Sequence, residues 1–234
     1  MTMQLFDLAG ADPDHRFSPY CWRVVMALQH KGLAYEAIPW RFSDKDKIAA
    51  TGQGAVPVIV ADGKFIHDSW TIANYLDERY PDHPLFGNDI ARGSALLIKH
   101  WAERTLHPMV SRMVMMDIYN AIHERDKVYF RESREKRFGM TLEQWSADRE
   151  TVREQFRIAL EPVRLTVQSQ AFISGATPAF ADYITFGALQ WARCVSPFKL
   201  LETDDPVYAW RSRVLELFGG VAGKAPARDT SFNA

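Results

Sequence analysis

Residues 17–32 run Phe17-Ser-Pro-Tyr-Cys-Trp-Arg-Val-Val-Met-Ala-Leu-Gln-His-Lys-Gly32. Ser18 is a favoured N-cap residue, and Pro19 suits the first helical position because its missing N–H would be unpaired there in any case. Gly32 suits the left-handed residue that follows the last turn of a helix. The stretch therefore predicts one helix with both of its ends marked.

This predicted helix has an apolar face and a polar end. Cys21, Val24, Val25 and Leu28 recur at helical spacing, so we expect this face to pack inward. The N-terminus of a helix carries partial positive charge and unpaired N–H groups, and a hydroxyl at Ser18 therefore lies in a field that stabilises an anion. The plain alternative is that Ser18 is only a helix cap.

The overall composition limits the classes of function. The chain has 234 residues, 47% of them hydrophobic, which is enough for one large domain or two small ones. A net charge of -1 gives no general attraction to nucleic acid or to an anionic membrane. No apolar run is long enough to cross a bilayer, so we expect a soluble cytoplasmic protein.

Cysteine and histidine usage points away from disulfides and metals. Cys21 and Cys194 lie in separate predicted helices, and free buried thiols suit a reducing compartment better than a disulfide would. The histidines are scattered without the spacing of metal ligands, so we expect no metal site.

The first eighty residues predict the order βαβαββα. The helix at 17–32 is followed by a short helix leading out of residues 41–50 and by a helix from Asp68 to Tyr80. Asp62-Gly63 is a strong signal for a hairpin turn between the last two strands. The predicted strands are Gln4–Leu8, Tyr35–Ile38, Val58–Ala61 and Lys64–His67.

The rest of the chain predicts helices only. Residues 82–89 contain proline and glycine and are the expected linker, which divides a domain at 1–81 from an all-helical domain at 90–234. Within the second domain we expect Pro108 to interrupt a helix, Pro162 to kink a long one, and the end of the chain to be a loose tail. The expected helices are 90–106, 109–122, 124–137, 141–169, 181–195 and 206–218, and the expected tail is 219–234.

This order of elements resembles the cytosolic glutathione transferase family over nearly the whole chain. The local matches are Ser18-Pro-Tyr-Cys21, Val56-Pro57, Asp68-Ser69 and Phe180-Ala-Asp-Tyr183. The resemblance implies a thioredoxin-like α/β N-terminal domain followed by an all-α helical bundle. Four stretches look most like bacterial β-etherases and their fungal serine-type relatives: 18–23, 68–70, 75–82 and 133–138.

The resemblance implies that glutathione is the co-substrate and that Ser18 is the catalytic residue. The Ser18 hydroxyl would donate a hydrogen bond to the glutathione thiolate, and Val56, ahead of a cis Pro57, would pair through its backbone with the cysteinyl residue. Asp68 would bind the ammonium group of the γ-glutamyl residue, and Ser69 its carboxylate. The plain alternatives are a helix cap at 68–69 and an edge-strand proline at 57.

Two positions depart from the family pattern. Many relatives have a basic residue where this chain has Ala55, so the glycine carboxylate needs Gln53, Arg41 or Lys45. Ala179 stands where the family usually has Ser or Thr, and Asp182 is therefore expected to act in stability with partners that the sequence does not identify.

An apolar set of side chains predicts a pocket for a second, hydrophobic aromatic substrate. Polarisable methionines and aromatic rings suit a planar electrophile such as an aryl ether, an aryl halide or an acceptor for conjugate addition, although core packing is the default for methionine. The resemblance also implies a homodimer. The expected pocket residues are Phe17, Tyr20, Trp40, Met109, Met113 and Met116.

Three other functions stay open at this stage. A protein of this fold can bind glutathione or an aromatic ligand without turnover. A glutathione-dependent isomerase of maleyl-type acids needs a basic residue for a second carboxylate, and the first helix offers only Arg23. A thiol oxidoreductase requires Cys21 to react, because a serine at position 18 cannot form a mixed disulfide.

Overall fold

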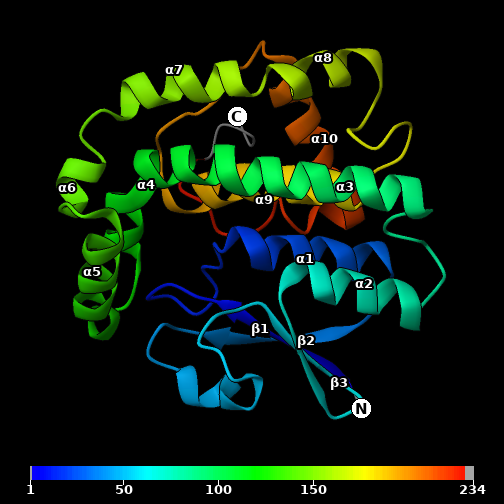
Figure 1. The fold of residues 1–234 in the computed structure, drawn as a ribbon, viewed down its shortest axis with the longest axis horizontal. Helices are drawn as coiled ribbons and strands as arrows, with labels where there is room; N and C mark the ends of the chain where they lie inside the picture. The colour runs from blue at the N-terminus through cyan, green and yellow to red at the C-terminus, as the bar shows by residue number, and fades with distance from the viewer. Residues whose placement is uncertain (1, 230–234) are drawn as a thin grey trace.

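The computed structural model describes residues 2–229, in which a small α/β domain is followed by a domain made only of helices (Figure 1). The first domain is a four-stranded sheet in the order β2-β1-β3-β4. β1 is parallel to β2 and antiparallel to β3, which is antiparallel to β4. The strands are β1 (Met3–Leu8), β2 (Tyr35–Trp40), β3 (Val58–Ala61) and β4 (Lys64–His67).

Local signals in the first domain give the structure that they predict. Ser18 caps α1 (Pro19–His30), and Gly32 follows that helix with φ of 65°. Asp62 and Gly63 form the hairpin turn with φ of 51° and 76°. The other helices are the 3-10 helix η1 (Lys45–Thr51) and α2 (Ser69–Arg79).

The second domain begins with a continuous helical rod that Pro108 does not interrupt. α3 (Asp89–Trp101) passes through a π-helical turn, η2 (Ala102–Leu106), into α4 (His107–Ala121). Proline removes a backbone N–H and its ring collides with the turn before it. The expected interruption is therefore replaced by a widened turn, which accommodates the ring without ending the helix.

The single helix expected over 141–169 is instead three helices. A capping box between Thr141 and Gln144 starts α6 (Leu142–Trp145), which is followed by α7 (Arg149–Ala159) and α8 (Glu161–Ser169). Pro162 lies in the first turn of α8, where proline is well tolerated, so it marks a start and not a kink. The remaining helices are α5 (Glu124–Phe138), α9 (Phe180–Val195) and α10 (Pro206–Gly220).

The expectation of a loose tail is wrong for residues 219–229. Arg193 donates hydrogen bonds to the carbonyls of Ala222 and Gly223, at 3.2 and 2.9 Å, and Ala222 is fully buried. The backbone N–H of Arg228 also donates to the carbonyl of Arg193. This part of the chain therefore covers α9, and residues 230–234 of the expected tail lie outside the described residues.

α9 is the central helix of the second domain and is buried on nearly all sides. Its Asp182 is fully buried, and the carboxylate accepts hydrogen bonds from four groups. Because one buried carboxylate joins the loop before α9 to α10, Asp182 ties three segments together. The donors are the N–H groups of Ile173, Ser174 and Ala179 and the indole of Trp210.

The two domains meet where α9 crosses α1. Gly187 on α9 lies so close to the start of α1 that a Cβ atom there would be 2.5 Å from the carbonyl oxygen of Pro19. A second contact joins the far end of α1 to α9, since the hydroxyl of Tyr183 lies 2.7 Å from Nδ1 of His30. α1 is thus held between the sheet and α9. Among residues 2–229, no helix combines the length and apolar composition needed to span a bilayer.

Candidate functional site

The strand register brings three segments of the first domain to one end of the sheet. Phe6, Val58 and His67 lie in one row across β1, β3 and β4. The start of β3 and the end of β4 therefore lie beside the end of β1. Because α1 connects two parallel neighbours, it returns antiparallel to β1, and its N-terminus lies at the same end. This end of the sheet is where we build the candidate site.

Ser18 occupies the N-terminus of α1 with a hydroxyl that can still donate. Its side chain is 5% exposed, and Oγ accepts one hydrogen bond from the backbone N–H of Cys21 at 3.3 Å. A hydroxyl that accepts in this way keeps its proton for another acceptor. No acidic residue lies in the first turn of α1, so nothing in that turn offsets the partial positive charge of the helix end.

Cys21 is unsuited to thiol chemistry. Its side chain is fully buried, and burial together with the negative charge of Asp7 raises the pKa of the thiol well above its ordinary value. Reactive cysteines have a lowered pKa and some exposure, and Cys21 has neither. This argues against the thiol oxidoreductase. Asp7 itself is buried beneath the turn, and burial raises its pKa to about 6 although the charge of Arg16 opposes the shift.

Val56 offers free backbone groups at the start of β3. The Val56–Pro57 peptide bond is cis, as predicted, and Pro57 is buried while Val56 is half-buried. In the part of the chain that the structure describes, neither the N–H nor the C=O of Val56 makes a hydrogen bond. An extended peptide could pair with these two groups as an added strand.

The N-terminus of α2 combines a carboxylate with an unpartnered hydroxyl. Asp68 is exposed, has φ of 68°, and its Oδ1 accepts hydrogen bonds from the N–H groups of Trp70 and Thr71 at 3.1 and 3.0 Å. Ser69 is 1% exposed, yet its Oγ has no partner among the described residues. A buried polar atom without a partner calls for an explanation, and a bound ligand is one.

The three candidates for the glycine carboxylate differ in availability. Arg41 is occupied, because its guanidinium donates to the carbonyls of Gly10 and Ala11 at 3.0 and 3.1 Å. The stem of Lys45 lies against the loop before Val56, since a Cβ atom at Gly54 would be 3.3 Å from Lys45 Cδ. Gln53 is half-buried in the same loop. Lys45 and Gln53 therefore remain as candidates.

The six residues expected to line a second pocket divide into two groups. Phe17, Trp40 and Met113 are core residues, at 2%, 1% and 1% exposure, and the indole of Trp40 donates to the carbonyl of Asp44. All three side chains are turned into the core, so these three are removed from the candidate pocket. Tyr20, Met109 and Met116 are half-buried and can still contact a ligand.

Tyr20 stands on a buried polar cluster that the sequence did not predict. Its ring lies 4.7 Å from the guanidinium of Arg23 and meets His107 edge-on at 5.0 Å. Arg23 is fully buried and donates to Glu103 at 2.7 Å, while its Nη2 lies 3.2 Å from Nε2 of His107. Burial, with the charge of Arg23, lowers the pKa of His107 to about 3, so this imidazole is neutral and accepts from Arg23.

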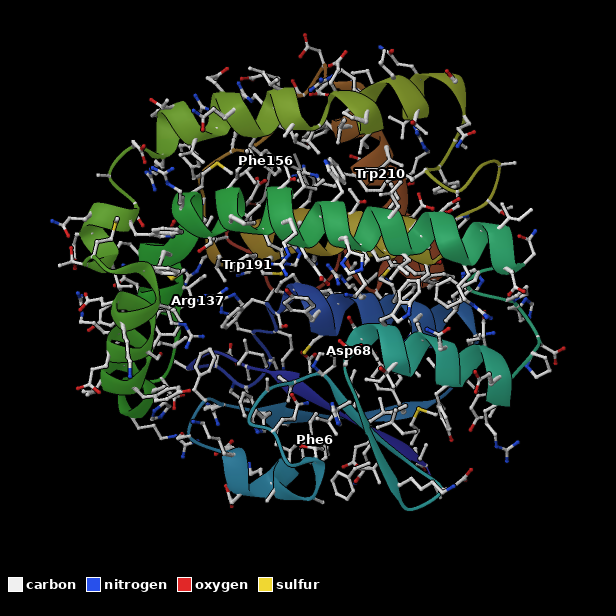
Figure 2. The ribbon with its side chains drawn as sticks, in the orientation of Figure 1. Phe6, Asp68, Arg137, Phe156, Trp191 and Trp210 are labelled. Atoms are coloured by element: carbon white, nitrogen blue, oxygen red, sulfur yellow. The ribbon has the colours of Figure 1, made fainter. Side chains whose placement is uncertain are left out.

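Arg137 is a cation in the last turn of α5. It is exposed, and it makes no hydrogen bond or ion pair within residues 2–229. Burial raises the pKa of Tyr20, and the positive charge of Arg137 partly offsets that rise. Figure 2 shows Arg137 and Asp68 along the boundary between the two domains. The charged stretch of sequence around Arg137 contains no motif for a functional site, so its position could be found only from the fold.

Among residues 2–229, no group of three or more His, Cys, Asp or Glu side chains could hold a metal ion.

Comparison with known proteins identifies the family. Models of the glutathione S-transferase N-terminal and C-terminal domains match residues 13–84 and 95–206. The two matches are adjacent and together cover most of the chain, so the chain belongs to the glutathione S-transferase family. They also agree with the observed order of a thioredoxin-like domain and a helical domain.

Individual relatives are similar over shorter or more divergent alignments. Glutathione S-transferase Z2 of Arabidopsis thaliana is 42% identical over 72 residues, which are 29% of this chain and 32% of that protein. The zeta-class glutathione S-transferase of Euphorbia esula is 29% identical over 109 residues, 44% of this chain and 47% of that one. The chain thus spans about a third to about a half of these curated relatives.

Solved structures share the fold over nearly the full length. A glutathione S-transferase of Ceriporiopsis subvermispora, crystallised in complex with glutathione, has a TM-score of 0.75 at 24% identity, covering 94% of this chain and 97% of that one. At this level of identity the likeness shows the fold alone.

Proposed function

We propose that this protein is a glutathione transferase in which Ser18 activates the thiol of bound glutathione. The observation that carries the proposal is the buried, unpartnered hydroxyl of Ser69 at the N-terminus of α2. A hydroxyl in that place, beside the exposed carboxylate of Asp68, suits the carboxylate and the ammonium group of one α-amino acid terminus. The γ-glutamyl end of glutathione is such a terminus.

The proposed binding mode assigns each part of the tripeptide to a segment at the end of the sheet. Asp68 binds the ammonium group and Ser69 the carboxylate of the γ-glutamyl residue. The free N–H and C=O of Val56 pair with the cysteinyl residue. Gln53, in the loop before Val56, and Lys45, which lies against that loop, bind the glycine carboxylate.

The proposed chemistry uses the thiol of glutathione as nucleophile. A thiol with an ordinary pKa of about 8.5 is mostly protonated at neutral pH, and a hydrogen bond from Ser18 to the thiolate lowers that pKa. The N-terminus of α1 favours the same charge because its first turn has no carboxylate. The protein supplies the stabilising groups, and the tripeptide supplies the sulfur.

The second substrate is proposed to be a hydrophobic aromatic electrophile, with an aryl ether as one candidate. Tyr20, Met109 and Met116 are the half-buried members of the predicted pocket and suit an aromatic ring. With an aryl ether, the thiolate forms a carbon–sulfur bond, the carbon–oxygen bond breaks, and the phenolate leaves with the electron pair. A phenolate has a conjugate acid of pKa about 10, so it needs little help from an acid.

We also propose a cytoplasmic homodimer. α3 exposes Ile90 and Leu97, at 84% and 71%, which is unusual for large aliphatic side chains on one helix. A second copy of the chain is the proposed cover for them, and sedimentation of the purified protein tests the dimer.

A second candidate function has its own observation. An isomerase of maleyl-type acids needs a cation for a second carboxylate, and Arg23 is unsuitable because it is fully buried and bound to Glu103. Arg137 is exposed and lies within electrostatic reach of Tyr20. It is the cation that this alternative would use.

The experiment is a binding test followed by a turnover test. The purified protein should bind glutathione-agarose and should then convert one of three probes with glutathione: an aryl ether, an aryl halide or a maleyl acid. Turnover of the ether or halide supports the transferase. Turnover of the maleyl acid alone, lost in R137A, supports the isomerase. Binding without any turnover supports a non-catalytic glutathione-binding protein, and absence of binding contradicts the proposal.

A further inference from the structure

α5 belongs to the helical domain but extends beside the first domain. In Figure 1 it descends at the left of the molecule to the level of the sheet. There it contacts the segment that follows β2, and we call this set of contacts the interdomain latch. From the segment after β2 the latch contains Phe42, Ser43, Asp44 and Lys45, and from α5 it contains Arg125, Asp126, Tyr129, Phe130 and Arg134.

The polar half of the latch consists of two buried carboxylates, one from each domain. Asp44 is 7% exposed, and its Oδ1 accepts from the guanidinium of Arg125 at 2.7 Å. Asp126 on α5 is 2% exposed, and its Oδ1 accepts from the backbone N–H of Ser43 at 2.9 Å. Each carboxylate therefore holds a group of the other domain, and hydrogen bonds to charged groups are stronger than neutral ones.

Asp44 also organises its own segment. Its Oδ2 accepts from Nζ of Lys47 at 3.1 Å and from the backbone N–H of Arg41 at 3.2 Å. Burial alone would raise its pKa, but these hydrogen bonds and the charges of Lys47 and Arg125 lower the pKa of Asp44 overall. The carboxylate is therefore ionised at neutral pH, which keeps both ion pairs intact.

The apolar half of the latch stacks rings and cations across the same boundary. The ring centroid of Phe42 lies 5.5 Å from that of Phe130, and the guanidinium of Arg134 covers both rings at 4.9 and 4.4 Å. The ammonium group of Lys45 lies 4.1 Å from the centre of the Tyr129 ring. Cation and ring attract each other at such distances. α5 thus fixes the position of Lys45 as well as that of the backbone around it.

The segment held by the latch leads directly to the proposed glutathione site. η1 begins at Lys45, the last residue of this segment, and the loop with Gln53 and Gly54 connects η1 to Val56. The stem of Lys45 returns against Gly54, so one lysine contacts both α5 and this loop. Besides α5, the first domain supplies the hydrogen bond from Trp40 to the carbonyl of Asp44.

We propose that Asp44 and Arg125 are positioning residues for glutathione, because the latch holds Lys45 where it meets the glycine carboxylate. The inference rests on the proposed function. A ligand's apparent dissociation constant rises in inverse proportion to the fraction of protein in the binding-competent arrangement. If loss of the latch leaves about 10% of molecules with Lys45 in place, the affinity contributed by that contact falls about tenfold.

The first test compares two arginines of the same helix. R125A removes a contact across the domain boundary, whereas R131A removes ion pairs with Glu135 and Glu143 that stay within the second domain. We expect R125A to raise the KM for glutathione about 5- to 10-fold with kcat changed less than about twofold, and R131A to leave both unchanged. R125K, which keeps the charge, should recover part of the loss. An unchanged KM in R125A overturns the proposal.

The second test asks which part of glutathione is affected. γ-Glutamylcysteine lacks the glycine residue, so it cannot use a contact to the glycine carboxylate. We expect R125A to lose most of the wild-type preference for glutathione over γ-glutamylcysteine, measured as the ratio of their kcat/KM values. A general loss of stability would weaken both compounds alike, and that outcome also overturns the proposal.

A third measurement keeps failure of the latch apart from failure of the proposed function. In the absence of any ligand, amide hydrogen exchange over residues 41–55 should be faster in R125A than in the wild type or in R131A. Equal exchange in all three proteins contradicts the latch whatever the protein binds. If exchange is faster in R125A but the wild type binds no glutathione, the proposed function is wrong. The role of the latch in that function is then wrong as well.

Discussion

The N-termini of α1 and α2 lie at the same end of the sheet and differ in their side chains. At α1, Ser18 has one backbone donor, and the first turn has no carboxylate. At α2, Asp68 caps the helix with a carboxylate, and the hydroxyl of Ser69 beside it has no partner in the described chain. The first end suits a lone anion such as a thiolate, whereas the second suits a group with both charges. In the proposed binding mode, two helix ends of one structural type therefore bind different parts of one ligand, the thiolate and the γ-glutamyl terminus.

The largest expected effect comes from removing the hydroxyl at α1. S18A should lower kcat with an aryl electrophile by about 10²- to 10³-fold, which is the usual cost of losing a donor that stabilises a reacting anion. The pKa seen in the pH profile of kcat/KM should rise toward the value of about 8.5 for a free thiol. Steady-state rates between pH 5.5 and 9 measure both. S169A, at an exposed position of α8, is the control. A normal rate in S18A would mean that the α1 end only caps a helix.

The next largest effect concerns the buried carboxyl group of Asp7, which lies beneath the N-terminus of α1. The pKa of Asp7 is raised to about 6 by burial, above the value of about 3.9 expected in the unfolded chain. The native protein therefore holds the extra proton, and the resulting stability is complete below pH 4 and is lost as the pH rises to about 6.

This loss amounts to at most about 3 kcal/mol, and D7N should abolish it. Urea unfolding of wild type and D7N at several pH values between 4 and 7 measures the difference. Parallel curves for the two proteins would show that Asp7 does not titrate in this range.

A smaller effect is expected from the carboxylate at α2. Asparagine is as good an N-cap as aspartate, so D68N should keep the melting temperature of the wild type. It loses the negative charge for the γ-glutamyl ammonium group, and we expect the KM for glutathione to rise about tenfold with kcat little changed. Kinetics and a thermal scan of the same preparation check this. A lower melting temperature with normal KM would make Asp68 a cap alone.

The smallest effect is expected at Ser69. Its buried hydroxyl has no protein partner, so S69A should not destabilise the unliganded protein. The variant should bind glutathione about fivefold more weakly, because the ligand carboxylate loses one donor. Calorimetric titration measures the affinity and urea unfolding the stability. If S69A lowers stability instead, the hydroxyl serves the fold and the comparison between the two helix ends fails.

Features that depend on neighbouring residues were predictable from the sequence. The cap at Ser18, the left-handed Gly32 and the turn at Asp62-Gly63 each follow from a short motif, whereas the cis bond before Pro57 was expected from the family resemblance. The unpartnered Ser69 was the expected carboxylate ligand on resemblance alone, and that role stays a prediction.

Features that depend on distant residues were not predictable. Trp40 and Met113 are residue types that are common in ligand pockets, but the packing of the elements buries both side chains in the core. Pro108 continues a helix because a π-helical turn precedes it. Asp44 and Arg125 lie 81 residues apart, so no local pattern could have joined them.

The crossing at Gly187 restricts which helical domains can be combined with this first domain. The backbone of Pro19, next to Ser18, lies so close to α9 that even a methyl group at position 187 has no room. A helical domain taken from another family member could be joined to this first domain only if it also had glycine at the crossing. Grafting to change substrate preference must therefore either keep a glycine at this crossing or accept a displaced Ser18.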